Sequence, residues 1–261
     1  IQMLKHITAL ALLAATAFPA LAAVQTKAVT YEHEGDTLTG HLYWDDAQSG
    51  KRPGVLVIHE WWGLNDYAKK RARMLAELGY VAFAADMYGT GKVTTDPGKA
   101  KEWMQGVTAD VEGWRERAGL GLTQLLNSGM VDADKTAAMG YCFGGATILQ
   151  MAYDNAPVKG VVSFHGALPA APEESKGKIG PQILVLHGAG DKFIAPEVVT
   201  NFRAKLQESG ATWEMNTYGG DVRHGFTNPD AAAFGIENLK YDATADQRSW
   251  SKMQSFFKEI F

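Results

Sequence analysis

The chain has 261 residues, of which 46% are hydrophobic and 21% are charged, and its formal net charge is −4 at pH 7. This is an ordinary globular composition, and the length suits one large domain whose core needs neither disulfides nor metals. The slight negative charge argues against nucleic acid as a partner, because nucleic-acid-binding domains usually carry a basic face.

Residues 1–22 have the pattern of a signal peptide. A short polar stretch precedes an apolar run over 7–18, and an A-x-A pattern ends at Ala22. We expect cleavage after Ala22 or Ala23 and export, with the periplasm as the expected location. A membrane anchor is the alternative, but the run is shorter than the ~20 apolar residues that cross a bilayer. We expect residues 23–261 to form a single domain.

Short apolar runs alternate with amphipathic stretches along the rest of the chain. The first predicted strand alternates between apolar and polar residues, and the later ones are mostly apolar, as in a sheet covered on both faces. This pattern predicts an α/β fold with a mostly parallel central sheet and helices on both faces. The predicted strands are 37–44, 54–59, 80–85, 136–141, 158–164, 183–187 and 213–218, and the predicted helices are 66–78, 97–127, 146–153, 196–207 and 242–261.

Residues 140–145 (Gly-Tyr-Cys-Phe-Gly-Gly) form a G-x-C-x-G elbow between a predicted strand and a predicted helix. The glycines permit a sharp turn that directs Cys142 out of the sheet. At a helix N-terminus the partial positive charge favours a thiolate. Cys142 is also the only cysteine, so an exported chain cannot use it in an internal disulfide. We interpret it as a nucleophile; a buried cysteine in a glycine-rich turn is the alternative.

A nucleophile of this kind needs a base and an acid that orients the base. In α/β-hydrolases both follow the nucleophile in the order acid, histidine. Asp191 follows a predicted strand, and His224 is the only histidine after it. Asp221 is a rival for the acid, but it lies crowded against the histidine in the same loop. A turn aspartate and a surface-loop histidine are the structural alternatives.

The loop after the strand at 54–59 begins with Glu60 and Trp61. In this fold the loop supplies one backbone N–H of the oxyanion hole, and the residue after the nucleophile supplies the other. We therefore expect the backbone N–H groups of Trp61 and Phe143 to form the oxyanion hole. Glu60 would lie beside the thiol and accept a hydrogen bond from its neutral form, because a carboxylate repels a thiolate. A capping or solvated Glu60 is the alternative.

The other histidines give weaker signals. His33 and His41 lie in early strands and are expected to be surface or edge residues, while His59, His165 and His187 lie near strand ends, where hydrogen bonding is expected. No pair has the spacing of metal ligands, so we expect neither a metal nor a cofactor.

Together these segments resemble the dienelactone hydrolase family. The resemblance runs from about residue 29 to the C-terminus and implies a triad of Cys142, His224 and Asp191. It also implies that Glu60 bonds the resting thiol and helps to form the thiolate when substrate binds. The shared residues are His59, Glu60, Gly63, Asn65, Asp86, Met87, Tyr88, 140–145, 188–191, His224, Gly225 and Phe226.

One departure from the family concerns the substrate. Members that cleave dienelactone hold its carboxylate with two arginines, and the aligned positions here are Thr90 and Asn228. An arginine can bind a carboxylate through two parallel hydrogen bonds, and neither threonine nor asparagine can replace that interaction. The sequence therefore predicts hydrolysis of small esters or lactones through a thioester acyl-enzyme, without commitment to dienelactone. A peptidase or acyltransferase, and a non-catalytic periplasmic binding protein, are the alternatives; neither nucleic acid nor a stable membrane span is expected.

Overall fold

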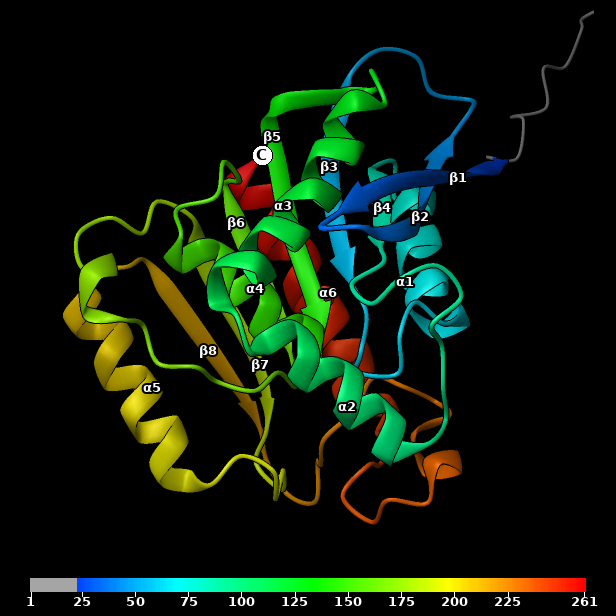
Figure 1. Ribbon diagram of the computed structural model, residues 1–261. Coiled ribbons are helices and arrows are strands. Elements are labelled where there is room, and N and C mark those ends of the chain that lie inside the picture. Colours follow the sequence, from blue (N-terminus) through cyan, green and yellow to red (C-terminus); the bar gives the residue numbers. More distant parts are fainter. Residues whose placement is uncertain (1–22) are drawn as a thin grey trace, which may run out of the picture.

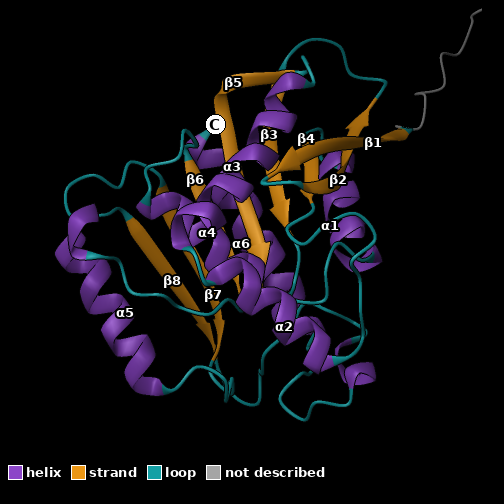
Figure 2. Ribbon diagram, in the orientation of Figure 1, coloured by secondary structure: helices purple, strands orange, loops and turns teal. Residues whose placement is uncertain are grey.

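The computed structural model describes residues 23–261, so the predicted signal peptide lies outside the described residues. The chain forms an eight-stranded sheet with the strand order β1-β2-β4-β3-β5-β6-β7-β8 (Figure 1). The β1–β2 and β2–β4 pairs are antiparallel, and all other neighbours are parallel. Helices cover both faces (Figure 2), which confirms the predicted α/β architecture. Within 23–261, no helix is both long and apolar enough to span a membrane.

The elements alternate along the chain as the apolar pattern predicts. The strands are β1 (Val24–His33), β2 (Asp36–Asp45), β3 (Arg52–Ile58), β4 (Val81–Ala85), β5 (Val131–Tyr141), β6 (Gly160–Phe164), β7 (Gln182–Gly188) and β8 (Trp213–Tyr218). The helices are α1 (Asp66–Glu77), α2 (Pro97–Thr108), α3 (Val111–Asn127), α4 (Phe143–Tyr153), α5 (Pro196–Ser209) and α6 (Ala243–Ile260), with short 3-10 turns at Glu173–Ser175 and Ala231–Phe234.

Two features differ from the sequence prediction. β1 was not predicted, and the single helix expected over 97–127 is wrong, because the chain breaks into α2 and α3. Asp110 causes the break: its carboxylate accepts hydrogen bonds from the backbone N–H groups of Glu112 and Gly113 at 3.1 and 3.2 Å. Aspartate at such a position satisfies the first N–H groups of a new helix better than it continues an old one.

The two faces of the sheet are covered by different helices. Side chains alternate along a strand, so Val55 and Val57 of β3 pack in the cluster that contains α1 and α6. Leu56 and Ile58 pack in the cluster that contains α3, α4 and α5. In Figure 1, α3 and α4 lie in front of the sheet and α6 lies behind it. The carboxyl ends of the parallel strands meet at one edge, where loops can bring side chains together.

Candidate active site

Cys142 occupies a strained elbow between β5 and α4. Its backbone has φ 54° and ψ −114°, a conformation that L-residues rarely adopt, and its N–H donates to the carbonyl of Phe164 at 3.0 Å. Glycine is required on both sides, because a Cβ on Gly140 would overlap the Gly144 carbonyl and one on Gly144 would overlap the Ile58 carbonyl. The turn leaves the thiol partly exposed at the N-terminus of α4.

The structure brings Asp191 and His224 together. Nδ1 of His224 lies 2.7 Å from Oδ2 of Asp191, and both residues are buried. Oδ1 of Asp191 accepts from Nδ2 of Asn238 at 3.0 Å and from the backbone N–H of Phe193 at 2.9 Å. Because Asp191 is an acceptor, Nδ1 carries the proton, and Nε2 has no hydrogen-bond partner within residues 23–261. The imidazole is thus oriented with one nitrogen available.

Charge in this cluster favours an ion pair. Burial alone would lower the pKa of His224, but the Cys142 thiolate and the Asp191 carboxylate raise it to about 10. Burial alone would raise the pKa of Asp191, but the hydrogen bonds from His224, Asn238 and Phe193 and the His224 charge lower it. These directions favour the protonated form of His224 and the ionised form of Asp191.

Asp221, the rival acid, lies on the surface. It bonds Nε of Arg223 at 2.6 Å and Nζ of Lys240 at 2.7 Å. These cations lower its pKa to about 2. Within residues 23–261 it makes no contact with His224 that would orient the ring, so the structure supports Asp191 as the partner.

Glu60 is buried in the loop after β3. Its Oε2 accepts a hydrogen bond from Nδ2 of Asn228 at 2.7 Å. Burial raises the pKa of Glu60 to about 7, although Asn228 and the charges of His224 and Arg71 oppose the change. Among the described residues Asn228 is thus the hydrogen-bond partner of Glu60, and the hydrogen bond from the Cys142 thiol stays a prediction.

The two positions aligned with the family's arginines have different environments. Asn228 is buried against Glu60, whereas Thr90 is exposed in the turn after β4. Thr90 donates its backbone N–H to the carbonyl of Thr37 of β2 at 2.9 Å, and its hydroxyl lies 2.8 Å from that of Thr39. Asn228 thus affects the charge of Glu60, whereas Thr90 holds the turn after β4 against β2.

The loop before Trp61 is fixed by His59. Nε2 of His59 accepts from the backbone N–H of Met87 at 3.1 Å, so Nδ1 carries the proton and donates to the carbonyl of Glu60 at 2.5 Å. Burial lowers the pKa of His59, which keeps the ring neutral. Within the described chain, the N–H groups of Trp61 and Phe143 donate to no other residue. Both remain available to a substrate oxygen.

A buried polar network supports the segment that carries His224. Nε2 of His165 lies 2.7 Å from Oγ1 of Thr227, and the hydroxyl of Tyr67 lies 2.5 Å from the same oxygen. Arg71 donates to the Thr227 carbonyl. The His165 ring also packs edge-on at 5.3 Å from the His224 ring. The sequence indicated that His165 would be hydrogen-bonded, but nothing in it identified Thr227 as the anchor.

The remaining histidines lie apart from the nucleophile. His33 lies on the edge strand β1, in agreement with the prediction of a surface or edge residue. Its side chain is nevertheless only 7% exposed, and its Nδ1 accepts a hydrogen bond from Nε of Arg117 of α3 at 3.1 Å. His41 is half-buried on β2, which is an interior strand paired with β1 and β4. His187 is buried near Asp191, and burial lowers its pKa.

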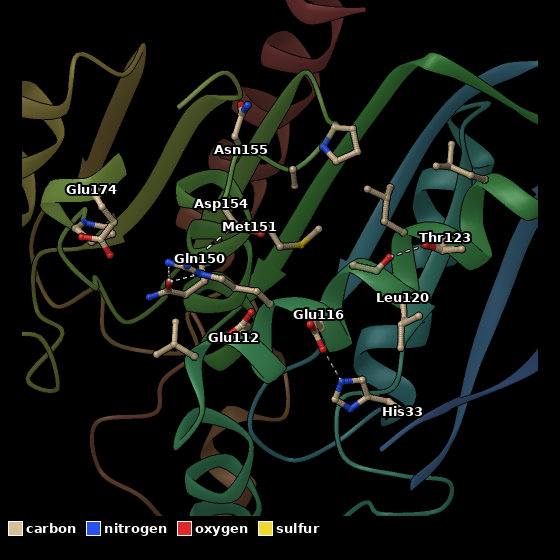
Figure 3. A pocket seen from close by; sticks show the side chains of 18 of the residues that line it. His33, Glu112, Glu116, Leu120, Thr123, Gln150, Met151, Asp154, Asn155 and Glu174 are labelled. Atoms are coloured by element: carbon tan, nitrogen blue, oxygen red, sulfur yellow. Dashed lines mark hydrogen bonds and ion pairs between the residues drawn. The ribbon is translucent and has the colours of Figure 1, made fainter. Parts of the chain in front are cut away.

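A large hollow lies elsewhere in the structure. It has a volume of about 1050 Å³ and runs between α3 and the end of α4 (Figure 3). Its lining includes neither Cys142 nor His224. Arg115, in its wall, already bonds Oε1 of Gln150 at 2.9 Å and pairs with Asp154 at 3.7 Å. The volume of a hollow therefore does not indicate the reactive site in this protein, whereas the positions of Cys142 and His224 do.

The family model for dienelactone hydrolases matches residues 38–261. The chain belongs to the dienelactone hydrolase family. Putative carboxymethylenebutenolidases of Yersinia pestis and Escherichia coli K12 are 26% and 25% identical, over 88% and 87% of this chain and 86% and 84% of theirs. A solved dienelactone hydrolase-like promiscuous phosphotriesterase from metagenomic libraries, P91, is 40% identical with a TM-score of 0.88, over 92% of this chain and 99% of that one. Another structure, m3DLH, is 37% identical with a TM-score of 0.87 and the same coverage.

Proposed function

We propose that this dienelactone hydrolase family member hydrolyses small carboxylic esters or lactones, with Cys142 as nucleophile, His224 as proton carrier and Asp191 as the orienting acid. One observation carries the proposal: a thiol in a strained elbow neighbours a buried imidazole whose other nitrogen is held by a carboxylate at 2.7 Å. This combination activates a nucleophile and orients its base.

In the first half of the reaction, the substrate carbonyl oxygen binds between the N–H groups of Trp61 and Phe143. The Cys142 thiolate attacks the carbonyl carbon, and the two amides stabilise the developing oxyanion. The tetrahedral intermediate collapses as Nε2 of His224 gives its proton to the leaving alkoxide. The products of this half are an alcohol and a thioester on Cys142.

In the second half, neutral His224 takes a proton from water as the water oxygen attacks the thioester carbon. The second tetrahedral intermediate expels the Cys142 thiolate and releases a carboxylic acid. The proton remains on His224, so the resting ion pair is restored. Asp191 stays ionised throughout, because its lowered pKa keeps it a carboxylate.

Glu60 modulates this ion pair. With a pKa raised to about 7, it is neutral in mildly acidic solution and adds no second negative charge beside the thiolate. Its partner is the uncharged amide of Asn228, where family members that cleave dienelactone have an arginine. We therefore propose that substrates without a carboxylate next to the scissile bond are preferred.

The test is turnover of p-nitrophenyl acetate and of a neutral lactone. Cys142→Ala should reduce kcat/KM by at least about 10³-fold, because the covalent route is lost. Iodoacetamide should label Cys142 in the folded protein. Wild-type turnover by Cys142→Ala would disprove the proposal, and a folded protein with neither turnover nor labelling would support the binding-protein alternative. A matched amide substrate distinguishes a peptidase.

The likeness to P91 supports a second candidate activity, on neutral phosphotriesters. The Cys142 thiolate would attack phosphorus and displace an aryloxide, and water would then hydrolyse the S–P bond. The same amides that face a carbonyl oxygen would face the phosphoryl oxygen. Aryloxide release from paraoxon that disappears in Cys142→Ala is the expected result; no release above the uncatalysed rate would exclude this activity.

A further inference from the structure

Tyr88 lies beside the elbow and has no assigned role. It follows β4 in the Asp86-Met87-Tyr88 segment and is 2% exposed. Its ring centroid lies 4.9 Å from that of His59 and 5.5 Å from that of Phe143. It therefore contacts the histidine that fixes the Trp61 loop and the residue that follows the nucleophile.

The Tyr88 hydroxyl is buried and has no hydrogen-bond partner within residues 23–261. Buried hydroxyl groups nearly always have a partner, and leaving one without a partner costs stability. Two other buried tyrosines follow that rule: Tyr31 donates to the Asp86 carbonyl at 3.2 Å and Tyr153 to the Pro169 carbonyl at 2.8 Å. Tyr141 shares the unpartnered state, but it lies in the core on the α1 and α6 face.

Tyr88 also lines a cavity of about 380 Å³, together with Trp103 and Val107 of α2, and the lining of this cavity does not include Cys142. The hydroxyl itself is buried. Burial and the charge of the Cys142 thiolate raise the pKa of Tyr88 well above its ordinary value. The hydroxyl therefore stays protonated throughout the working pH range and can only gain by donating to an oxygen that enters the site.

The neighbours of Tyr88 indicate which oxygen it meets. Tyr88 packs against Phe143, whose N–H is one donor of the predicted oxyanion hole, and against His59, whose ring fixes the loop that carries the other donor, Trp61. His224, which delivers the proton to the leaving group, packs instead against Phe193 and His165 at 5.1 and 5.3 Å. Tyr88 therefore belongs to the carbonyl-oxygen side of the site.

We propose that Tyr88 is a catalytic residue whose hydroxyl is a third hydrogen-bond donor of the oxyanion hole. A carbonyl oxygen that becomes an alkoxide gains a lone pair and negative charge, so a third donor stabilises the tetrahedral state more than the ester. The hydrogen bond forms without proton transfer, and no further reactant is needed. This inference rests on the proposed function of Cys142.

The test compares Tyr88→Phe with Tyr153→Phe. Tyr88→Phe removes a hydroxyl that bonds nothing within residues 23–261, so Tm should stay the same or rise while kcat falls about 100-fold with little change in KM. Tyr153→Phe breaks the hydrogen bond to the Pro169 carbonyl at the far end of α4 from the elbow, so Tm should fall and kcat should stay at the wild-type value. A purely structural role for Tyr88 would not produce this opposite pattern.

A trifluoromethyl ketone, which forms a tetrahedral adduct with the thiol, provides a second readout. Its affinity should fall by the same factor as kcat/KM in Tyr88→Phe. If that variant is insoluble, Tyr88→Met serves for both measurements. Wild-type kcat in Tyr88→Phe, or a rise in KM alone, would overturn the inference while Cys142→Ala remains inactive. Activity in Cys142→Ala would instead overturn the proposed function itself.

Discussion

The site contains two buried carboxyl groups whose pKa values are shifted in opposite directions. Asp191 accepts hydrogen bonds from His224, Asn238 and Phe193, and these donors lower its pKa despite burial. Glu60 accepts one strong bond, from the neutral amide of Asn228, and burial raises its pKa to about 7. Both side chains are buried, and the larger number of donors to Asp191, one of them charged, favours its ionised form. Asp191 is a permanent anion, whereas Glu60 can change its charge near neutral pH.

Replacing Asp191, the permanent anion, should have the largest effect on kcat. Asp191→Asn keeps the shape but puts an amide against Nδ1 of His224, which favours the wrong tautomer and removes the charge that stabilises the imidazolium. We expect kcat for p-nitrophenyl acetate to fall on the order of 10³- to 10⁴-fold. Steady-state kinetics checks this.

The matched control for that variant is Asp221→Asn, which removes the surface carboxylate bonded to Arg223 and Lys240. It should leave kcat within about twofold of the wild-type value. If Asp221→Asn lost activity and Asp191→Asn kept it, the assignment of the acid would be reversed.

Replacing Glu60, whose charge can change near neutral pH, should change the pH profile of kcat/KM. Glu60→Gln copies the neutral form, so kcat/KM at pH 6 should stay within about tenfold of the wild-type value. The wild-type profile should show an inflection near pH 7 from ionisation of Glu60, and the variant should lack it. An inflection that persists in Glu60→Gln would assign the titration to another group.

The same carboxyl should make stability depend on pH. Its folded pKa of about 7 exceeds the ordinary 4.5, so between these values the folded state keeps a proton that the unfolded chain releases. The stabilisation is complete below pH 4.5, declines as pH rises and is lost above 7. Wild-type protein should lose roughly 3 kcal/mol from this group across that window, and Glu60→Gln should not. Urea unfolding at pH 5 and 8 measures the difference.

The smallest expected effect comes from the donor to Glu60. Asn228→Leu removes the amide at similar volume, so the pKa of Glu60 should rise and the inflection in kcat/KM should move to higher pH. Asn238→Leu removes the equivalent amide from Asp191, whose pKa lies far below neutrality. It should leave the inflection in place, and an equal shift in both variants would contradict the pairing of Asn228 with Glu60.

The sequence predicted both carboxylates of this comparison, but it did not predict the asparagine donors that shift their pKa values. Strand-end motifs predicted the sheet, the elbow at Cys142 and the order Asp191, His224, because such signals are local and parallel strands end at one edge. The donors to the two carboxylates come from distant loops: Asn238 meets Asp191 across 47 positions and Asn228 meets Glu60 across 168. No local pattern marks such pairs, and the burial of His33 by Arg117 escaped prediction for the same reason.

The central claim is that Cys142 carries the acyl group during turnover. Mass spectrometry of wild-type protein quenched in acid during steady-state hydrolysis of p-nitrophenyl acetate tests it most directly. We expect one acetyl group per chain, located on the peptide that contains Cys142, and its disappearance after the substrate is consumed. Turnover with no acetylated Cys142, or with the acetyl group on another residue, would contradict the account.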